Sequence, residues 1–303
     1  MADDYDVVIA GGGMAALTGG LFSARLGHST LVLAGVAPGG LLLSIEQVEG
    51  VPAFPDGVPG YELCPIAQEQ AEAAGAEIAP DELESLEAAD GGFRVNGQIS
   101  AKAVILATGG RLRELGVPGE ERLRGSGVSH CASCDAPLLR EKVAGVIGGG
   151  DSACQEALTL AGPLSQVLIL CRGGELSAQE TYRARVAEHP KIEVRHAVVV
   201  EEILGDSKVT GVRTAGGEEI ALDAVFVYVG LAPNSEAVAD LLSLDAGGHV
   251  PTDPSLQTEL PGLFAAGIVR SDAAHQAAGS AGDGAAAAKA ASRHLANGGA
   301  SHA

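Results

Sequence analysis

Two cysteines, Cys131 and Cys134, stand two residues apart and are followed directly by Asp135. Thiols at this spacing close a small disulfide ring when the backbone between them is turned or helical, so that one thiolate attacks and the other resolves. A neighbouring carboxylate can act as the acid and base that such exchange needs. The pattern predicts a redox-active pair, with Cys131, Cys134 and Asp135 as the catalytic residues.

A zinc half-site is the alternative explanation for the same spacing. Structural zinc needs a second Cys/His pair, and the sequence holds none with ligand spacing, so we expect no metal site. The other three cysteines, Cys64, Cys154 and Cys171, are expected to be small buried apolar residues.

A glycine-rich loop near the start of the chain predicts a dinucleotide-binding unit. Gly11, Gly13 and Ala16 follow an apolar strand at 6–10 and open a helix that ends at Gly27, before a second strand at 30–33. The first glycine of such a motif allows the tight turn, and the second lets a pyrophosphate approach the backbone. The acidic residue that would bind the ribose is missing, because Ala34 follows the second strand.

The same pattern occurs again at Gly148, Gly150 and Ala153, between a strand at 143–147 and a helix from 151 to about 160. A strand at 166–170 completes this second unit. Two strand–loop–helix–strand units predict an α/β fold with two Rossmann-like, three-layer domains. The second loop is either another dinucleotide site or a structural copy whose site is silent.

Charge and hydropathy exclude several classes of function. The 303 residues include 39 acidic and 19 basic side chains, a net charge of −20, which repels nucleic acid and anionic membranes. No apolar run is long enough to cross a bilayer. The acidic N-terminus lacks the layout of a signal peptide, so a cytoplasmic location is expected.

Taken together, these segments resemble the low-molecular-weight thioredoxin reductases, which are FAD-dependent pyridine nucleotide-disulfide oxidoreductases. The resemblance covers nearly the full length of the chain. It rests on the order and spacing of segments at 10–13, 38–40, 107–109, 131–135, 148–153, 229–234, 262–267 and 276–277.

The resemblance implies an FAD-binding domain from residues 1–113 and 242–303, and an inserted domain, 114–241, that carries the cysteine pair. It implies a homodimer whose substrate is a thioredoxin-like protein or a small disulfide. Cys134 would face the flavin, Cys131 would attack the partner's disulfide and Asp135 would handle protons. The implied FAD-binding residues are Gly11, Gly13, Ala16, Gly39, Gly40, Thr108, Gly109, Gly267, Gln276 and Ala277. The implied second dinucleotide site comprises Gly148, Gly150, Ser152, Ala153 and Arg172.

The sequence departs from this family where NADPH would bind. Relatives clamp the 2′-phosphate with His-Arg-Arg and a further arginine four residues on, whereas here only Arg172 is kept, close to Glu175. A doubly charged phosphate needs several charge-assisted hydrogen bonds. NADPH use is therefore in doubt, and the electron donor is expected to be ferredoxin, another flavin, or a second flavin lodged in the second site.

Contacts to the flavin and to the partner protein also differ. Leu41, Gly50 and Ile268 replace a glutamine, an asparagine and an aspartate that contact the flavin in relatives. Ser126 and Pro137-Leu138 stand where relatives hold thioredoxin with an arginine and aromatic residues. FAD remains the expected cofactor.

Two further functions fit the same residues. One is a dithiol oxidase, in which electrons would flow in the opposite direction. The direction of electron flow depends on the reduction potentials of the flavin, the disulfide and the compartment. Alternatively the chain would be a non-catalytic flavin redox sensor whose cysteine pair switches a surface.

Overall fold

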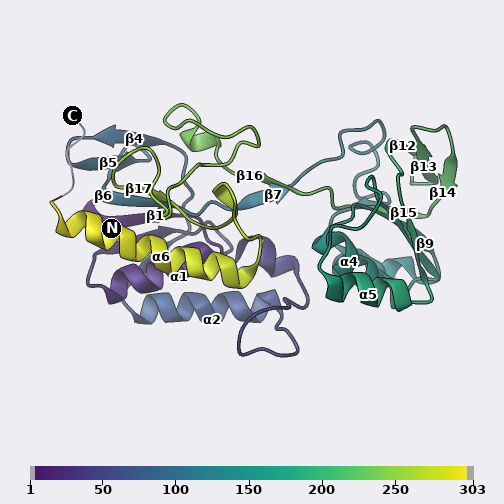
Figure 1. Ribbon diagram of the computed structural model, residues 1–303, viewed down its shortest axis with the longest axis horizontal. Helices are drawn as coiled ribbons and strands as arrows, with labels where there is room; N and C mark the ends of the chain where they lie inside the picture. The colour runs from purple at the N-terminus through teal and green to yellow at the C-terminus, as the bar shows by residue number, and fades with distance from the viewer. Residues whose placement is uncertain (1–3, 299–303) are drawn as a thin grey trace. The chain divides into compact units, whose positions relative to one another are not determined.

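The computed structural model describes residues 4–298, which fold into two compact units. The first unit comprises the described residues up to Arg111 and from Ala232 onward, and the second is Leu112–Leu231. The first unit is therefore discontinuous in sequence, and the second is inserted into it. Figure 1 shows the elements of each unit.

The first unit is built on a seven-stranded sheet in the order β3-β2-β1-β6-β5-β4, with β17 paired to β6. The pairs among β1, β2, β3, β6 and β17 are parallel, whereas β4 and β5 are antiparallel to their neighbours. The strands are β1 (Asp4–Ala10), β2 (Thr30–Leu33), β3 (Glu77–Ala79), β4 (Leu86–Ala89), β5 (Gly92–Val95), β6 (Ile99–Leu106) and β17 (Leu263–Ala265).

Side chains alternate across this sheet and make two cores. In β1, Val7 and Ile9 join the core under the helices, while Val8 and Ala10 join the core on the opposite face. The helices are α1 (Met14–Arg25), α2 (Gly60–Ala73) and α6 (Ala277–Ala296), and the 3₁₀ turns are η1 (Gly40–Ser44), η3 (Glu236–Val238) and η4 (Gly267–Val269).

Helices α1 and α6 cross at close range because small residues line their contact. A Cβ on Gly284 of α6 would overlap the backbone carbonyl of Ala15 in the first turn of α1. Glycine is needed there for close backbone approach rather than for its dihedral freedom. The crossing fixes the N-terminus of α1 against α6, which is where the first glycine loop lies.

The second unit is a three-layer structure around a five-stranded parallel sheet in the order β11-β10-β9-β15-β8. Its strands are β8 (Val128–Ser129), β9 (Val143–Ile147), β10 (Gln166–Leu170), β11 (Ile192–Arg195) and β15 (Ala224–Val227). One core forms with α3 (Ala132–Asp135), η2 (Ala136–Leu139), α4 (Asp151–Ala161) and α5 (Glu180–Glu188). The other core forms with the antiparallel sheet of β12 (Val200–Leu204), β13 (Gly211–Thr214) and β14 (Glu219–Ala221). The predicted α/β class with two Rossmann-like domains is confirmed.

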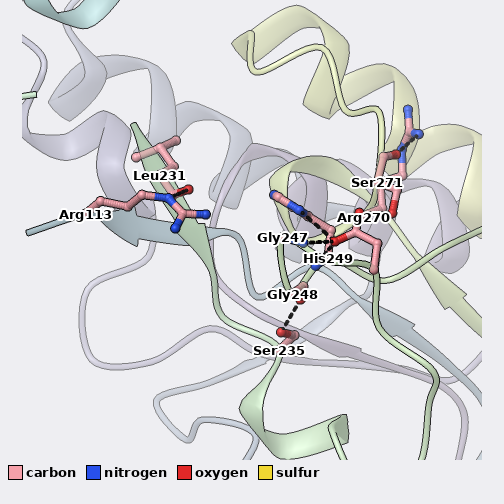
Figure 2. Close-up of polar contacts among 9 residues, drawn as sticks. Arg113, Leu231, Ser235, Gly247, Gly248, His249, Arg270 and Ser271 are labelled. Atoms are coloured by element: carbon pink, nitrogen blue, oxygen red, sulfur yellow. Dashed lines mark hydrogen bonds and ion pairs between the residues drawn. The ribbon is translucent and has the colours of Figure 1, made fainter. Parts of the chain in front are cut away.

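The chain passes between the units through two paired strands, β7 (Gly110–Leu112) and β16 (Leu231–Pro233). Next to these strands, Arg113 Nε donates to the carbonyl of Leu231 at 2.8 Å, a hydrogen bond within the second unit (Figure 2). The expected borders were 113/114 and 241/242, and the structure divides the chain at 111/112 and 231/232. The second border is earlier because Val238 is buried in the core of the first unit.

Within residues 4–298, no helix is both long and apolar enough to span a membrane.

Candidate active site

The predicted redox pair forms a disulfide on the second unit, with 5.4 Å between the Cα atoms of Cys131 and Cys134. Cys131 is the N-cap of the short helix α3, and its Sγ accepts the Cys134 amide at 3.3 Å. Cys134 is exposed, Cys131 is half-buried and Asp135 ends the helix, also half-buried. Backbone N–H groups at a helix start favour a thiolate, so the local geometry favours Cys131 as the thiolate after reduction.

Two side chains fix the segment just before the pair. The Ser129 hydroxyl accepts the Cys131 amide at 3.1 Å, and His130 Nδ1 lies 3.1 Å from the carbonyl of Val227. Val227 is the last residue of β15. The disulfide is thus attached to the carboxyl end of a parallel strand, the edge where open α/β sheets bind ligands.

Two residues that sequence reasoning missed lie beneath this helix. Glu156 of α4 accepts the amide of Ala132 through Oε2 at 3.2 Å, and Tyr228, directly after β15, is 7% exposed. Sequence spacing alone gave no signal for either, because both approach the pair from distant elements.

The first glycine loop has the geometry of a phosphate cradle. Gly11 has φ +125°, and a Cβ there would overlap the carbonyl of Ala107, whereas a Cβ on Gly13 would meet no protein atom within 4 Å. The first turn of α1 holds no acidic residue, and Gly13 caps it without a side-chain hydrogen bond. Open space before free helix amides is what a pyrophosphate requires.

Other predicted FAD-binding residues gather around this loop. The Gly39 amide donates to the Gly12 carbonyl at 2.7 Å, and a Cβ on Gly40 would stand 3.7 Å from Gly13 Cα. A Cβ on Gly267 would stand 3.0 Å from the Cβ of Ala15. These distant segments of the chain therefore meet at the N-terminus of α1.

The end of β6 carries the next predicted contacts. Thr108 Oγ1 donates to the Asn234 carbonyl at 2.5 Å, and Asn234 Nδ2 donates to the Thr108 carbonyl at 3.0 Å. Gly109 follows with φ +69°. Gln276 is the N-cap of α6 and Ala277 its first residue, while Ala16 is fully buried in α1. The glycine cradle and these helix starts fit an FAD pyrophosphate.

Of the three departures on the flavin side, Leu41 and Ile268 lie in the 3₁₀ turns η1 and η4, and Gly50 lies outside the helices and strands. Ile268 is half-buried, with its Cγ2 3.1 Å from where a Cβ on Gly110 would stand. Gly50 has φ +72° with nothing within 4 Å of its missing side chain, and Leu41 lies in η1.

A charged pair that sequence reasoning missed adjoins Gly267. Asp283 of α6 accepts the Gly267 amide at 3.0 Å and binds Arg270 in bidentate fashion, at 2.6 Å to Nε and 3.1 Å to Nη2. Both side chains are more than four-fifths buried. The pair places a carboxylate beside Gly267 although the neighbouring position holds Ile268. The signal in the sequence was a lone aspartate in an alanine-rich helix.

The segment carrying Arg270 is held in turn by Asp245. Its carboxylate accepts the amides of Gly247 and His249 and the hydroxyl of Ser271, at 2.7–2.9 Å. These three donor residues are labelled in Figure 2. These hydrogen bonds, the one from Ser271 foremost, lower the pKa of Asp245 to about 2. Asp245 is thus a structural anion that fixes the loop leading to Arg270.

The second glycine loop repeats the shape of the first. Gly148 has φ +147°, Gly150 caps α4, and Ser152 and Ala153 lie in its first turn, exposed and buried respectively. Asp151, also in this turn, accepts both the amide and the side chain of Gln179, at 2.7 and 2.6 Å. An acidic residue in the first turn opposes an incoming phosphate.

The loop expected to recognise the nucleotide holds little positive charge. Arg172 and Glu175 are both exposed in it, and the amide of Ser177 donates to the Gly149 carbonyl at 2.8 Å. This loop is folded back on the glycine turn with a single cation, a poor match for a 2′-phosphate.

The remaining cysteines are buried, as predicted. Burial raises the pKa of the Cys64 thiol to about 11. Burial, assisted by the charge of Asp151, raises that of Cys154 to about 11 as well. Across the described part of the chain, no group of three or more His, Cys, Asp or Glu side chains is placed to hold a metal ion.

Comparison with known proteins agrees with this architecture. The family model described as pyridine nucleotide-disulphide oxidoreductase matches residues 5–292. A thioredoxin reductase of Treponema pallidum is 37% identical, over 97% of this chain and 98% of its own. The crystal structure of Lactococcus lactis thioredoxin reductase superposes with a TM-score of 0.91 at 36% identity, covering 97% of this chain and 99% of its own.

A more distant structure matches the chain over a similar length. The ferredoxin-flavin thioredoxin reductase of Clostridium acetobutylicum matches with a TM-score of 0.53 at 27% identity, covering 97% of this chain and 99% of its own. With a glycine cradle for FAD, a disulfide at the edge of the second sheet and these relatives, the chain belongs to the pyridine nucleotide-disulphide oxidoreductase family, as an FAD-dependent, thioredoxin reductase-like enzyme.

Proposed function

We propose that the enzyme passes electrons through FAD in the first unit to the Cys131–Cys134 disulfide, and from there to the disulfide of a thioredoxin-like protein or of a small molecule. The observation that carries this proposal is the disulfide itself, capped on α3 and followed by Asp135. Bound FAD supplies reversible two-electron transfer.

The chain's own residues perform the exchange half of the reaction. Two electrons and two protons convert the Cys131–Cys134 disulfide into two thiols. The Cys131 thiolate then attacks the substrate disulfide, whose sulfur–sulfur bond breaks as a mixed disulfide forms. Cys134 attacks Cys131 Sγ, restores the internal disulfide and releases the substrate as a dithiol. Asp135 takes the proton from the attacking thiol and returns one to the leaving thiolate.

The donor that we propose is ferredoxin or another flavin rather than NADPH. Arg172 is the cation of the nucleotide loop, and Asp151 and Glu175 add negative charge near it. A nicotinamide dinucleotide with a 2′-phosphate is disfavoured by this balance. The Clostridium relative, named for ferredoxin and flavin, supports such a donor on the same fold. A second flavin in the second glycine loop is a further form of this proposal.

The test is an anaerobic titration of the purified flavoprotein with NADPH, NADH and reduced ferredoxin, followed by flavin absorbance. The proposal predicts bleaching by ferredoxin or by dithionite, and none by either nicotinamide at stoichiometric amounts. Prompt bleaching by NADPH would show that Arg172 suffices and would overturn the donor assignment. Failure of thioredoxin and small disulfides to reoxidise the reduced enzyme would overturn the substrate assignment.

We further propose a homodimer in the cytoplasm. A thiol-maintaining compartment suits an enzyme that produces dithiols, and the family resemblance supports the dimer. Sedimentation of the flavoprotein tests the oligomeric state, and a monomer at micromolar concentration would contradict it.

A further inference from the structure

An acidic side chain from another helix contacts the start of α3, the short helix that Cys131 caps. Glu156 lies on the second turn of α4, which packs against α3. Its Oε2 accepts the amide of Ala132, the residue between Cys131 and Ser133, at 3.2 Å. Ala132 itself is fully buried. This amide is the first N–H of α3, one of the unpaired backbone donors that make a helix start favourable to a thiolate.

A buried phenol adjoins the same carboxylate. The Tyr228 hydroxyl is buried and makes no hydrogen bond within normal geometric limits. Burial raises the pKa of Tyr228 far above its usual range, and the nearby carboxylates of Glu156 and Asp135 add to the effect. The phenol therefore stays neutral and keeps its proton to offer to Glu156. Its backbone is fixed, since the Tyr228 amide donates to the Ile147 carbonyl at 2.8 Å.

We infer that Glu156, backed by Tyr228, is a positioning residue that keeps the Cys131–Cys134 couple strongly reducing. The carboxylate occupies the Ala132 N–H and places a negative charge under the helix. Both effects disfavour a thiolate at Cys131, whose remaining partners are the Cys134 amide at 3.3 Å and the Ser133 hydroxyl at 3.5 Å. A couple whose thiolate is disfavoured holds electrons less firmly and gives them up to a substrate disulfide more readily.

The test is the exchange equilibrium of the intact flavoprotein with dithiothreitol. In this exchange the protein disulfide becomes two thiols while dithiothreitol becomes its cyclic disulfide, so electrons and protons balance. After acid quenching and alkylation, mass spectrometry of the peptide with Cys131 and Cys134 gives the reduced fraction. Neither a donor nor a protein substrate is needed. The inference deepens the proposed redox role of the pair, yet its failure is distinguishable from failure of the proposed function.

Glu156→Gln keeps an oxygen that can accept the Ala132 N–H and removes the charge. We expect its exchange constant to shift about tenfold toward the reduced protein, which is about 30 mV for a two-electron couple. The matched control is Glu188→Gln, which removes an equal charge from the exposed end of α5 and should leave the constant unchanged. An unchanged constant in Glu156→Gln, or an equal shift in the control, would overturn the inference.

A second variant keeps the test decisive if Glu156→Gln does not fold. Tyr228→Phe retains the buried ring and removes only the hydroxyl, so the carboxylate loses the polar O–H group near it and takes up a proton more readily. We expect a shift in the same direction but smaller, about threefold, or roughly 15 mV. A constant equal to that of the unmodified protein in Tyr228→Phe would also overturn the inference.

Discussion

The substitution Gly13→Ala should change FAD affinity without changing the stability of the fold. The φ of −78° and ψ of −177° at Gly13 suit any residue, and a Cβ there meets no protein atom within 4 Å. Alanine at an N-cap destabilises the folded state by up to about 1 kcal/mol relative to glycine. In the other direction, alanine lowers the conformational entropy of the unfolded chain, which stabilises the folded state by about 0.4–1 kcal/mol. The stability of the apoprotein should therefore be nearly unchanged by Gly13→Ala.

FAD binding should be affected far more strongly. The added methyl occupies the space where the pyrophosphate approaches the helix amides. Losing two charge-assisted hydrogen bonds costs about 3–6 kcal/mol, and about 3 kcal/mol already weakens binding by roughly 100-fold. Reconstitution of apoprotein with FAD, followed by flavin fluorescence, measures the dissociation constant, and thermal unfolding of the apoprotein measures stability.

Two comparison variants sharpen the result. Gly216→Ala alters an exposed turn between β13 and β14, where a Cβ would make only an ordinary contact with Thr214 Oγ1 at 3.7 Å, and FAD affinity should not change. Gly11→Ala puts a methyl into the Ala107 carbonyl at φ +125°, so the first unit itself should fail to fold. The reasoning is refuted if Gly13→Ala binds FAD as tightly as the unmodified protein, or if its apoprotein unfolds like Gly11→Ala.

Three further outcomes are expected. Asp135→Asn should lower turnover with a disulfide substrate by about 100-fold while leaving FAD content intact; unchanged turnover would remove Asp135 from the proton steps. The Cys64 and Cys154 thiols have pKa values raised to about 11, so they stay protonated at pH 8. Iodoacetamide should then label neither in the native reduced enzyme, and rapid labelling of either by mass spectrometry would contradict their burial. Gly173→Arg combined with Ser177→Arg should tighten NADPH binding by about 100-fold or more, because two new phosphate hydrogen bonds contribute about 1.5–3 kcal/mol each. Calorimetry showing no gain would mean that weak NADPH binding has a cause other than the missing arginines.

Local patterns predicted the elements of this fold well. The strand at 143–147 and the helix that starts at 151 appear as β9 and α4, because apolar runs and glycine turns are signals within one short segment. The structure divides into units at positions that differ from the expected domain borders. Residues 232–241 belong to the first unit because Val238 packs into its core, and such packing depends on partners far away in sequence.

In the candidate site, too, features with a local sequence signal could be predicted, and features that depend on distant residues could not. The spacing of Cys131 and Cys134 and the glycines of both loops could be recognised from sequence, since they are short motifs with a mechanical reason. Glu156 and Arg270 could not, because each acts on a backbone group or a carboxylate supplied by a separate element. The alternating sheet and the crossing of α1 with α6 bring such partners together, and no local periodicity encodes the pairing.

The most direct test of the central claim is the number of reducing equivalents that the flavoprotein accepts. Anaerobic dithionite titration of the unmodified enzyme, with alkylation of thiols at each point, should show uptake by both the flavin and the Cys131–Cys134 disulfide. A Cys134→Ser variant should take up only the flavin's share and lose turnover, while retaining its FAD. Equal uptake by both proteins, or turnover that survives in the variant, would contradict electron flow through this disulfide.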